Sequence, residues 1–198
     1  MTNLTDELPG GAAGPLERVL KLMQALVIAG GVVMALTFSF VVVFRYGFNA
    51  NLFAYEEWLM AASFWVFFIG AALASAQKAH INADILGFLI TNPRVIWWRE
   101  LVVETIEILV LLLVCYWAYL MIAEEIGTYP LWQTTNALKI PFLVPRLGIF
   151  VGYICMTAFA ILHFYLLIRK GPGWADHHEE LEHPPVEDIA LIDEGKGK

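Results

Sequence analysis

Charged residues are scarce in this chain of 198 residues, of which 16% are charged and 59% hydrophobic. Soluble globular proteins carry about 25% charged and about 45–50% apolar residues. A water-soluble fold would therefore leave too much apolar surface without a polar covering. The sequence also lacks a basic cluster interleaved with aromatic residues, which argues against a nucleic-acid partner.

Cysteines are few, and the common catalytic motifs are missing. Cys115 and Cys155 both lie in apolar runs, with no CxxC pair and no disulfide framework, so they are expected to be small buried hydrophobic residues. The chain contains no phosphate-binding loop, no HExxH and no GxSxG. The sequence therefore predicts no catalytic residue and no metal site.

In place of charge, the chain has four long apolar stretches. Crossing about 30 Å of hydrocarbon takes about 20 apolar residues in a helix, and only helices or closed barrels satisfy their backbone groups in lipid. The sequence predicts an all-α membrane protein with four transmembrane helices in a domain over residues 15–170. Tails at 1–14 and 171–198, the second one acidic, are expected to be disordered. The predicted spans are residues 22–44, 59–76, 101–123 and 147–168.

The distribution of Lys and Arg predicts the orientation, because cytoplasmic loops carry the excess of these residues. Seven flank one side of the four spans and three flank the other. This places both termini and the loop 77–99 in the cytoplasm, in a bacterial inner membrane. Within that loop, the segment INADILGFLI is expected to form a short interfacial amphipathic helix. The seven are Arg18, Lys21, Lys78, Arg94, Arg99, Arg169 and Lys170, and the three are Arg45, Lys139 and Arg146.

A pair of acidic residues opens the second span. Glu56 and Glu57 lie where a carboxylate suits the positive end of the helix dipole. They are expected either to cap this helix and pair with Arg45, or to contact a partner subunit.

Three glutamates, Glu100, Glu104 and Glu107, recur at helical spacing on one face of the third span. Glu107 lies about 12 Å along the helix axis beyond Arg99, a depth at which an ionisable group usually needs a partner. Beyond it the span offers only one cysteine and two tyrosines as polar groups, too few for a continuous ion path. Structural pairing is therefore favoured over ion translocation.

Small residues at helical spacing occur in two of the spans. They are Gly148-x-x-x-Gly152 in the fourth and Gly70-x-x-x-Ala74 in the second. This spacing lets membrane helices approach closely. It predicts two helix faces that pack against other helices.

Two histidines support an alternative function. His80 and His163 are both expected toward the cytoplasmic side and could ligate a b-type haem, which would make the chain a membrane cytochrome. However, His80 follows Lys78 at the end of a span, where an exposed or capping histidine is ordinary. A third hypothesis, a stand-alone four-helix pore, requires flux through this chain alone.

Several motifs, taken in order, resemble one transporter family. Over about residues 17–168 the chain is similar to the DctQ-like family, the small membrane subunits of tripartite ATP-independent periplasmic (TRAP) transporters. It departs from the family pattern at Ala61, where many members carry a basic residue. The matching motifs are Arg45, Glu56-Glu57, Phe64-Trp65, Gly70-Ala71-Ala72, His80-Ile81-x-x-Asp84 and NALKIP at 136–141.

The resemblance implies a non-enzymatic subunit that binds no cofactor itself and braces a large membrane subunit within the lipid. The large subunit carries the substrate and ion sites, a periplasmic binding protein delivers the substrate, and a sodium or proton gradient drives symport of an organic acid such as a C4-dicarboxylate. His80 and Asp84 are then expected to anchor the interfacial helix or contact the large subunit. The other polar residues assigned to the interface or to structural pairing are Arg45, Glu56, Glu57, Glu104 and Glu107.

Overall fold

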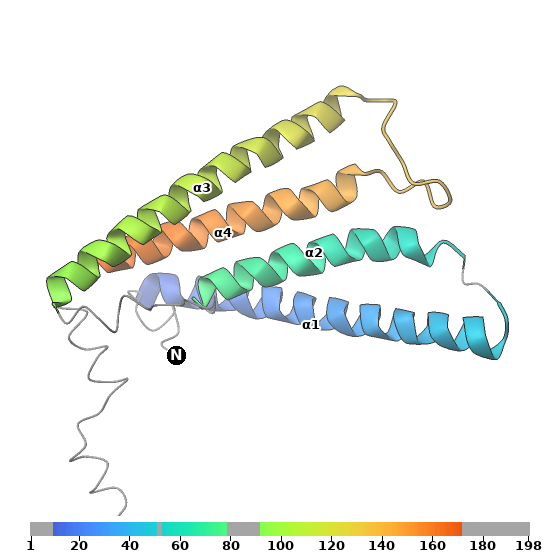
Figure 1. The fold of residues 1–198 in the computed structure, drawn as a ribbon, viewed down its shortest axis with the longest axis horizontal. Helices are drawn as coiled ribbons and strands as arrows, with labels where there is room; N and C mark the ends of the chain where they lie inside the picture. The colour runs from blue at the N-terminus through green and yellow to red at the C-terminus, as the bar shows by residue number, and fades with distance from the viewer. Residues whose placement is uncertain (1–9, 51–52, 79–91, 172–198) are drawn as a thin grey trace, which may run out of the picture. The chain divides into compact units, whose positions relative to one another are not determined.

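The structure is a computed structural model that describes residues 10–50, 53–78 and 92–171. Within these ranges the chain forms four α-helices and no strand (Figure 1). All four are long and apolar enough to cross a membrane, which confirms the predicted all-α, four-span fold. The interfacial helix expected in the loop 77–99 falls mainly on residues outside the described ranges. The helices are α1 (Gly10–Gly47), α2 (Tyr55–Ala76), α3 (Pro93–Gly127) and α4 (Leu143–Lys170).

The helices extend beyond the apolar stretches that predict them. α1 begins at Gly10, within the segment expected to be disordered, because extending a formed helix by a turn is far easier than nucleating one. α3 begins at Pro93, a first position where a missing N–H costs no helical hydrogen bond. The side chain of Asn92 caps this end by accepting a hydrogen bond from the Arg94 N–H at 3.1 Å.

The loop between α3 and α4 is shorter than the predicted spans 101–123 and 147–168 imply. These spans leave residues 124–146 outside the helices, but the loop covers only residues 128–142. Pro145 lies in the first turn of α4, where backbone N–H groups have no helical acceptor in any case. Glu124 and Glu125 correspondingly belong to the last turns of α3.

The chain divides into two compact units, residues 1–80 with 108–160 and residues 81–107 with 161–198. In the first unit α1 lies alongside α2 (Figure 1). Gly30 lets α1 approach Val66 so closely that a Cβ at this position would clash with a Val66 methyl group and the Val66 side chain would have to shift. A Cβ at Gly70 on α2 would make only ordinary contact, 3.8 Å from the Val27 side chain.

The second unit contains the first part of α3 and the last part of α4. Trp97 on α3 donates its indole N–H to the backbone oxygen of Leu167 on α4, at 3.1 Å. Trp97 also contacts Trp98 edge to face, with ring centroids 5.3 Å apart. Leu166 and Leu167 are buried in this unit. An indole that reaches a buried backbone carbonyl satisfies its N–H while contributing a large apolar surface.

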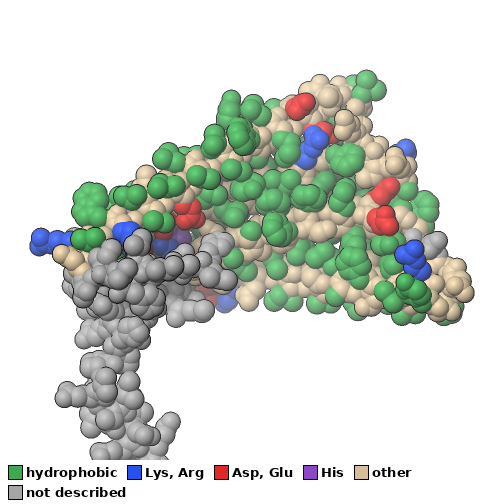
Figure 2. Space-filling model, in the orientation of Figure 1, with side chains coloured by type: hydrophobic (Ala, Val, Ile, Leu, Met, Phe, Trp, Pro, Cys, Tyr) green, Lys and Arg blue, Asp and Glu red, His purple; other side chains and the backbone are tan. Residues whose placement is uncertain are grey.

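Apolar side chains dominate the surface of the helices. Figure 2 shows hydrophobic side chains over most of the visible face, with Lys, Arg, Asp and Glu gathered mainly toward helix ends. Most exposed large hydrophobic residues belong to α1 and α3. Soluble proteins rarely expose apolar surface on this scale, whereas lipid or another membrane subunit covers it readily.

Candidate interaction site

Glu57, in the first turn of α2, binds the loop between α3 and α4. Its Oε1 accepts a hydrogen bond from the Ala137 N–H at 2.8 Å, and its Oε2 accepts one from the Leu138 N–H at 2.7 Å. Hydrogen bonds to an ionised carboxylate are stronger than neutral ones. One side chain therefore fixes the position of a loop about 80 residues further along the chain.

The loop presents these N–H groups because it folds back on itself. The Thr135 N–H donates to the Ile140 oxygen at 3.0 Å, and the Ile140 N–H donates to the Thr135 hydroxyl oxygen at 2.9 Å. The tight turn places Lys139 in the left-handed region, with φ of 56°. A second backbone hydrogen bond, from Phe142 to Gln133, closes the base of this turn at 3.0 Å.

The predicted ion pair with Arg45 is absent from the contacts of the described residues. Both carboxylate oxygens of Glu57 are occupied by loop N–H groups, and Glu56 is exposed. Arg45 lies in the last turn of α1, where its charge suits the negative end of the helix dipole. Glu57 is thus bound by the loop backbone and Arg45 is favoured by the end of α1, without a contact between the two.

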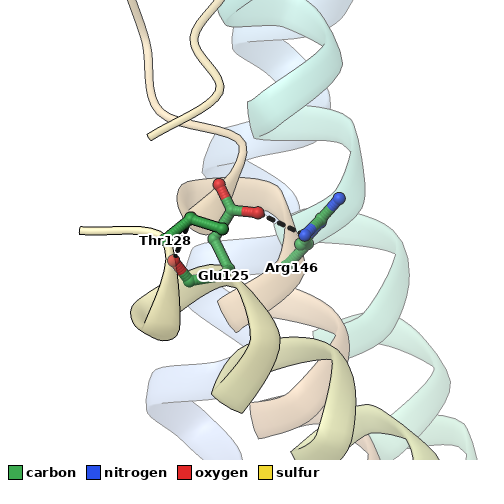
Figure 3. Close-up of polar contacts among 3 residues, drawn as sticks. All are labelled: Glu125, Thr128 and Arg146. Carbon is green, nitrogen blue, oxygen red and sulfur yellow. Dashed lines mark hydrogen bonds and ion pairs between the residues drawn. The ribbon is translucent and has the colours of Figure 1, made fainter. Parts of the chain in front are cut away.

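A buried ion pair joins the end of α3 to the start of α4. Glu125 is only 3% exposed and accepts a hydrogen bond from the Arg146 guanidinium (Figure 3). The Thr128 hydroxyl donates to the backbone oxygen of Glu125 at 2.7 Å and closes the last turn of α3. The other carboxylate oxygen of Glu125 is buried without a hydrogen-bond partner. A carboxylate this deep depends on Arg146, because burying an unpaired charge is strongly unfavourable.

The GxxxG sequence of α4 lies against α2. A Cβ at Gly148 would lie 3.2 Å from the ring of Trp65, and a Cβ at Gly152 would lie 2.5 Å from the Cβ of Phe68. Trp65 donates its indole N–H to the Val144 oxygen at 3.0 Å, and the rings of Phe68 and Tyr153 meet with centroids 5.3 Å apart. Two glycines thus allow two aromatic side chains of α2 to rest on the backbone of α4. Ala74 is half-buried on α2.

The remaining predicted site residues lie on α3 and α4 or outside the described residues. Glu104 is buried and Glu107 is exposed, and each has an interaction partner within the chain. His163 is half-buried on α4, and it too has an interaction partner. His80, the second ligand of the haem hypothesis, and Asp84 lie outside the described residues. In the part of the chain that is described, no group of three or more His, Cys, Asp or Glu side chains could hold a metal ion.

The sequence matches the protein-family model described as "Tripartite ATP-independent periplasmic transporters, DctQ component" over residues 33–170. The chain belongs to the DctQ family. The match covers more than half of the chain, from the middle of α1 to the last residue of α4. No curated protein matches the sequence.

Membership in the DctQ family makes the chain a small membrane component of a TRAP transporter. The resemblance drawn from the motifs is thereby confirmed. DctQ components work with a large membrane subunit and a substrate-binding protein, and four apolar helices fit a multi-pass inner-membrane protein. The contacts of Glu57, Glu125 and Gly152 are internal ties within the first compact unit of this DctQ component.

Sequence reasoning missed the Glu125–Arg146 pair. Arg146 is named only among the basic residues that predict the orientation, and Glu125 lies beyond the predicted span 101–123. A signal was available, because an acidic residue at the end of one span and a basic residue at the start of the next lie on the same side of a membrane. What the sequence does not specify is their burial, which depends on how α3 and α4 pack.

Proposed function

We propose that this chain braces the large membrane subunit of a TRAP transporter for uptake of an organic acid, such as a C4-dicarboxylate, driven by a sodium or proton gradient. In this role the chain is not an enzyme and binds no cofactor of its own. Its partners are the large subunit, the periplasmic binding protein and membrane lipid. Both termini lie in the cytoplasm, as the excess of basic residues on that side favours.

The main support for the proposal is the position of the glutamates whose contacts are known. Glu57 binds the backbone of a loop and Glu125 pairs with Arg146, both at helix ends. Between Glu107 and Glu124, α3 carries no charged residue over 16 positions. An ion path would need polar groups across this depth, whereas a bracing subunit needs the rigid helix contacts that α2 and α4 make.

The proposal is tested by deleting this chain in cells that express the complete transporter. Uptake of the substrate should be lost, and it should return when the chain is supplied on a plasmid. Affinity purification of the tagged chain should recover the large subunit. Normal uptake in the deletion strain, or purification of the chain without any membrane partner, would contradict the proposal.

A further inference from the structure

Three aromatic side chains with polar groups project from the second half of α3. Tyr116, Trp117 and Tyr119 are 58%, 62% and 56% exposed. Tyr116 lies nine residues after Glu107 and eight before Glu124. At 1.5 Å per residue it is therefore about 12–14 Å from either charge along the helix axis. The predicted span 101–123 is centred on residue 112, so Tyr116 and Trp117 lie about 6–8 Å from its midpoint and Tyr119 about 10 Å, all within the hydrocarbon layer, which is about 30 Å thick.

This depth is unusual for these residue types. Tyr and Trp are enriched at the membrane–water interfaces, where the ring lies in apolar surroundings and the O–H or N–H meets water. Lipid tails offer no hydrogen-bond acceptor, so an exposed hydroxyl or indole N–H at mid-membrane depth is left unsatisfied. Within the described ranges none of the three side chains makes a hydrogen bond. By contrast, Trp65 and Trp97 each donate to a backbone oxygen of α4.

The exposed face of α1 has a different chemistry. Its exposed large side chains between Leu26 and Val43 are all hydrocarbon, which lipid tails can cover, and the exposed Gln24 lies only two residues inside the predicted span 22–44. Two hydroxyls occur between Leu26 and Val43, and both are satisfied by the helix itself. Thr37 donates to the Val33 oxygen at 2.7 Å, and Ser39 donates to the Ala35 oxygen at 2.9 Å. The outer face of α1 therefore needs no protein partner.

The three aromatic residues of α3 belong to a continuous surface. Tyr116 follows Leu109 and Leu113 at helical spacing and precedes Leu120, and the three leucines are exposed. Residues at this spacing lie on one face of a helix. The opposite face of α3 packs on α4, where the Cys115 sulfur lies 3.3 Å from the Thr157 hydroxyl oxygen. We name the exposed surface the α3 stripe, formed by Leu109, Leu113, Tyr116, Trp117, Tyr119 and Leu120.

We propose that the α3 stripe is the surface through which this chain binds the large membrane subunit, and that the outer face of α1 is left to lipid. The inference rests on the proposed function and specifies its interface. The occupant is a transmembrane segment of the large subunit that presents hydrogen-bond acceptors, backbone or side-chain oxygens, at mid-membrane depth. These acceptors satisfy the two tyrosine hydroxyls and the indole N–H, which lipid cannot.

Photo-crosslinking in the intact complex tests this assignment. The crosslinker p-benzoylphenylalanine is placed at Trp117 on α3 and, in a matched control, at Val33 on α1. Val33 is 49% exposed and lies at the centre of the uncharged stretch 22–44, so both probes are exposed and lie within the hydrocarbon layer. The probe at Trp117 should crosslink to the large subunit, and the probe at Val33 should not.

A second measurement probes the hydroxyls. Tyr116→Phe and Tyr119→Phe keep the ring, so the chain should fold normally by circular dichroism. Each should weaken association with the large subunit by about threefold, the typical effect of one hydrogen bond between membrane helices. A Phe40→Leu variant on α1 should leave association unchanged.

Each other outcome overturns the inference in a distinguishable way. Crosslinks from Trp117 to lipid alone show a lipid-facing stripe, and crosslinks to a second copy of this chain show a homodimer interface. Crosslinks to the large subunit from Val33 but not from Trp117 place the interface on α1. In all three cases the proposed function stands if the unmodified chain purifies with the large subunit. If it does not, the proposed function fails as well.

Discussion

The buried Glu125–Arg146 pair predicts an asymmetric response to mutation. The side chain of Glu125 is 4% exposed and that of Arg146 is 29% exposed. Arg146→Met strands a carboxylate that already has one unpartnered oxygen. Removing one partner of a buried pair typically costs about 3–5 kcal/mol, so this variant should lose about 3 kcal/mol of unfolding free energy.

The opposite variant should be much milder. Glu125→Gln leaves the guanidinium of Arg146 unpaired, but water can reach that group, so the loss should be about 1 kcal/mol. The difference of about 2 kcal/mol corresponds to about 30-fold in the unfolding equilibrium constant. Replacing both residues, Glu125→Leu with Arg146→Met, removes the charges together and should stay within about 1 kcal/mol of the parent.

The assay is SDS-induced unfolding of the purified chain in mixed micelles, followed by tryptophan fluorescence. The midpoints should rank parent and double variant above Glu125→Gln, with Arg146→Met lowest. If Glu125→Gln lowers the unfolding midpoint as much as Arg146→Met does, the difference in burial between the two side chains does not determine the response to mutation. If the double variant is the least stable, the ion pair makes a large net contribution to the unfolding free energy, which contradicts the prediction.

Four further predictions concern the helix packing, the Glu57 contacts, the haem hypothesis and the orientation. Gly152→Ala should destabilise the chain by about 1–3 kcal/mol through overpacking against Phe68, whereas Gly31→Ala, with open space around its Cβ, should not; SDS titration compares them. Glu57→Gln removes the charged acceptor that binds the loop backbone, so trypsin should cleave faster after Lys139 in vesicles that expose the outer face. Unchanged cleavage would contradict the role of the hydrogen bonds between Glu57 and the loop. The purified chain should show no Soret band, and a band would revive the haem hypothesis. A fluorescent tag at the N-terminus should report a cytoplasmic location, and a periplasmic one would reverse the proposed orientation.

The helices could be predicted because their signal is local. Each span is an uncharged run long enough to cross the hydrocarbon, and backbone satisfaction in lipid leaves helix as the only choice for such a run. Helix ends were less predictable. Prolines mark breaks only within a helix, and both Pro93 and Pro145 lie in first turns, where they are tolerated.

The polar contacts could be predicted only in part. Glu57 was recognised as important from its position, but its partners proved to be backbone N–H groups about 80 residues away rather than Arg45. Side-chain identity does not distinguish one backbone N–H from another, so the sequence does not indicate which N–H groups bind Glu57. The spacing of Gly148 and Gly152 indicated a packing face, yet which helix would lie on it depended on the tertiary arrangement.

Reconstitution into liposomes tests the central claim most directly. Substrate uptake under an imposed sodium or proton gradient is measured with the binding protein present, for vesicles holding the large subunit alone, this chain alone, or both. Uptake should require both membrane subunits, and vesicles with this chain alone should be as tight as empty ones. Gradient-driven uptake through this chain alone, or full uptake by the large subunit without it, would contradict its role as a bracing subunit.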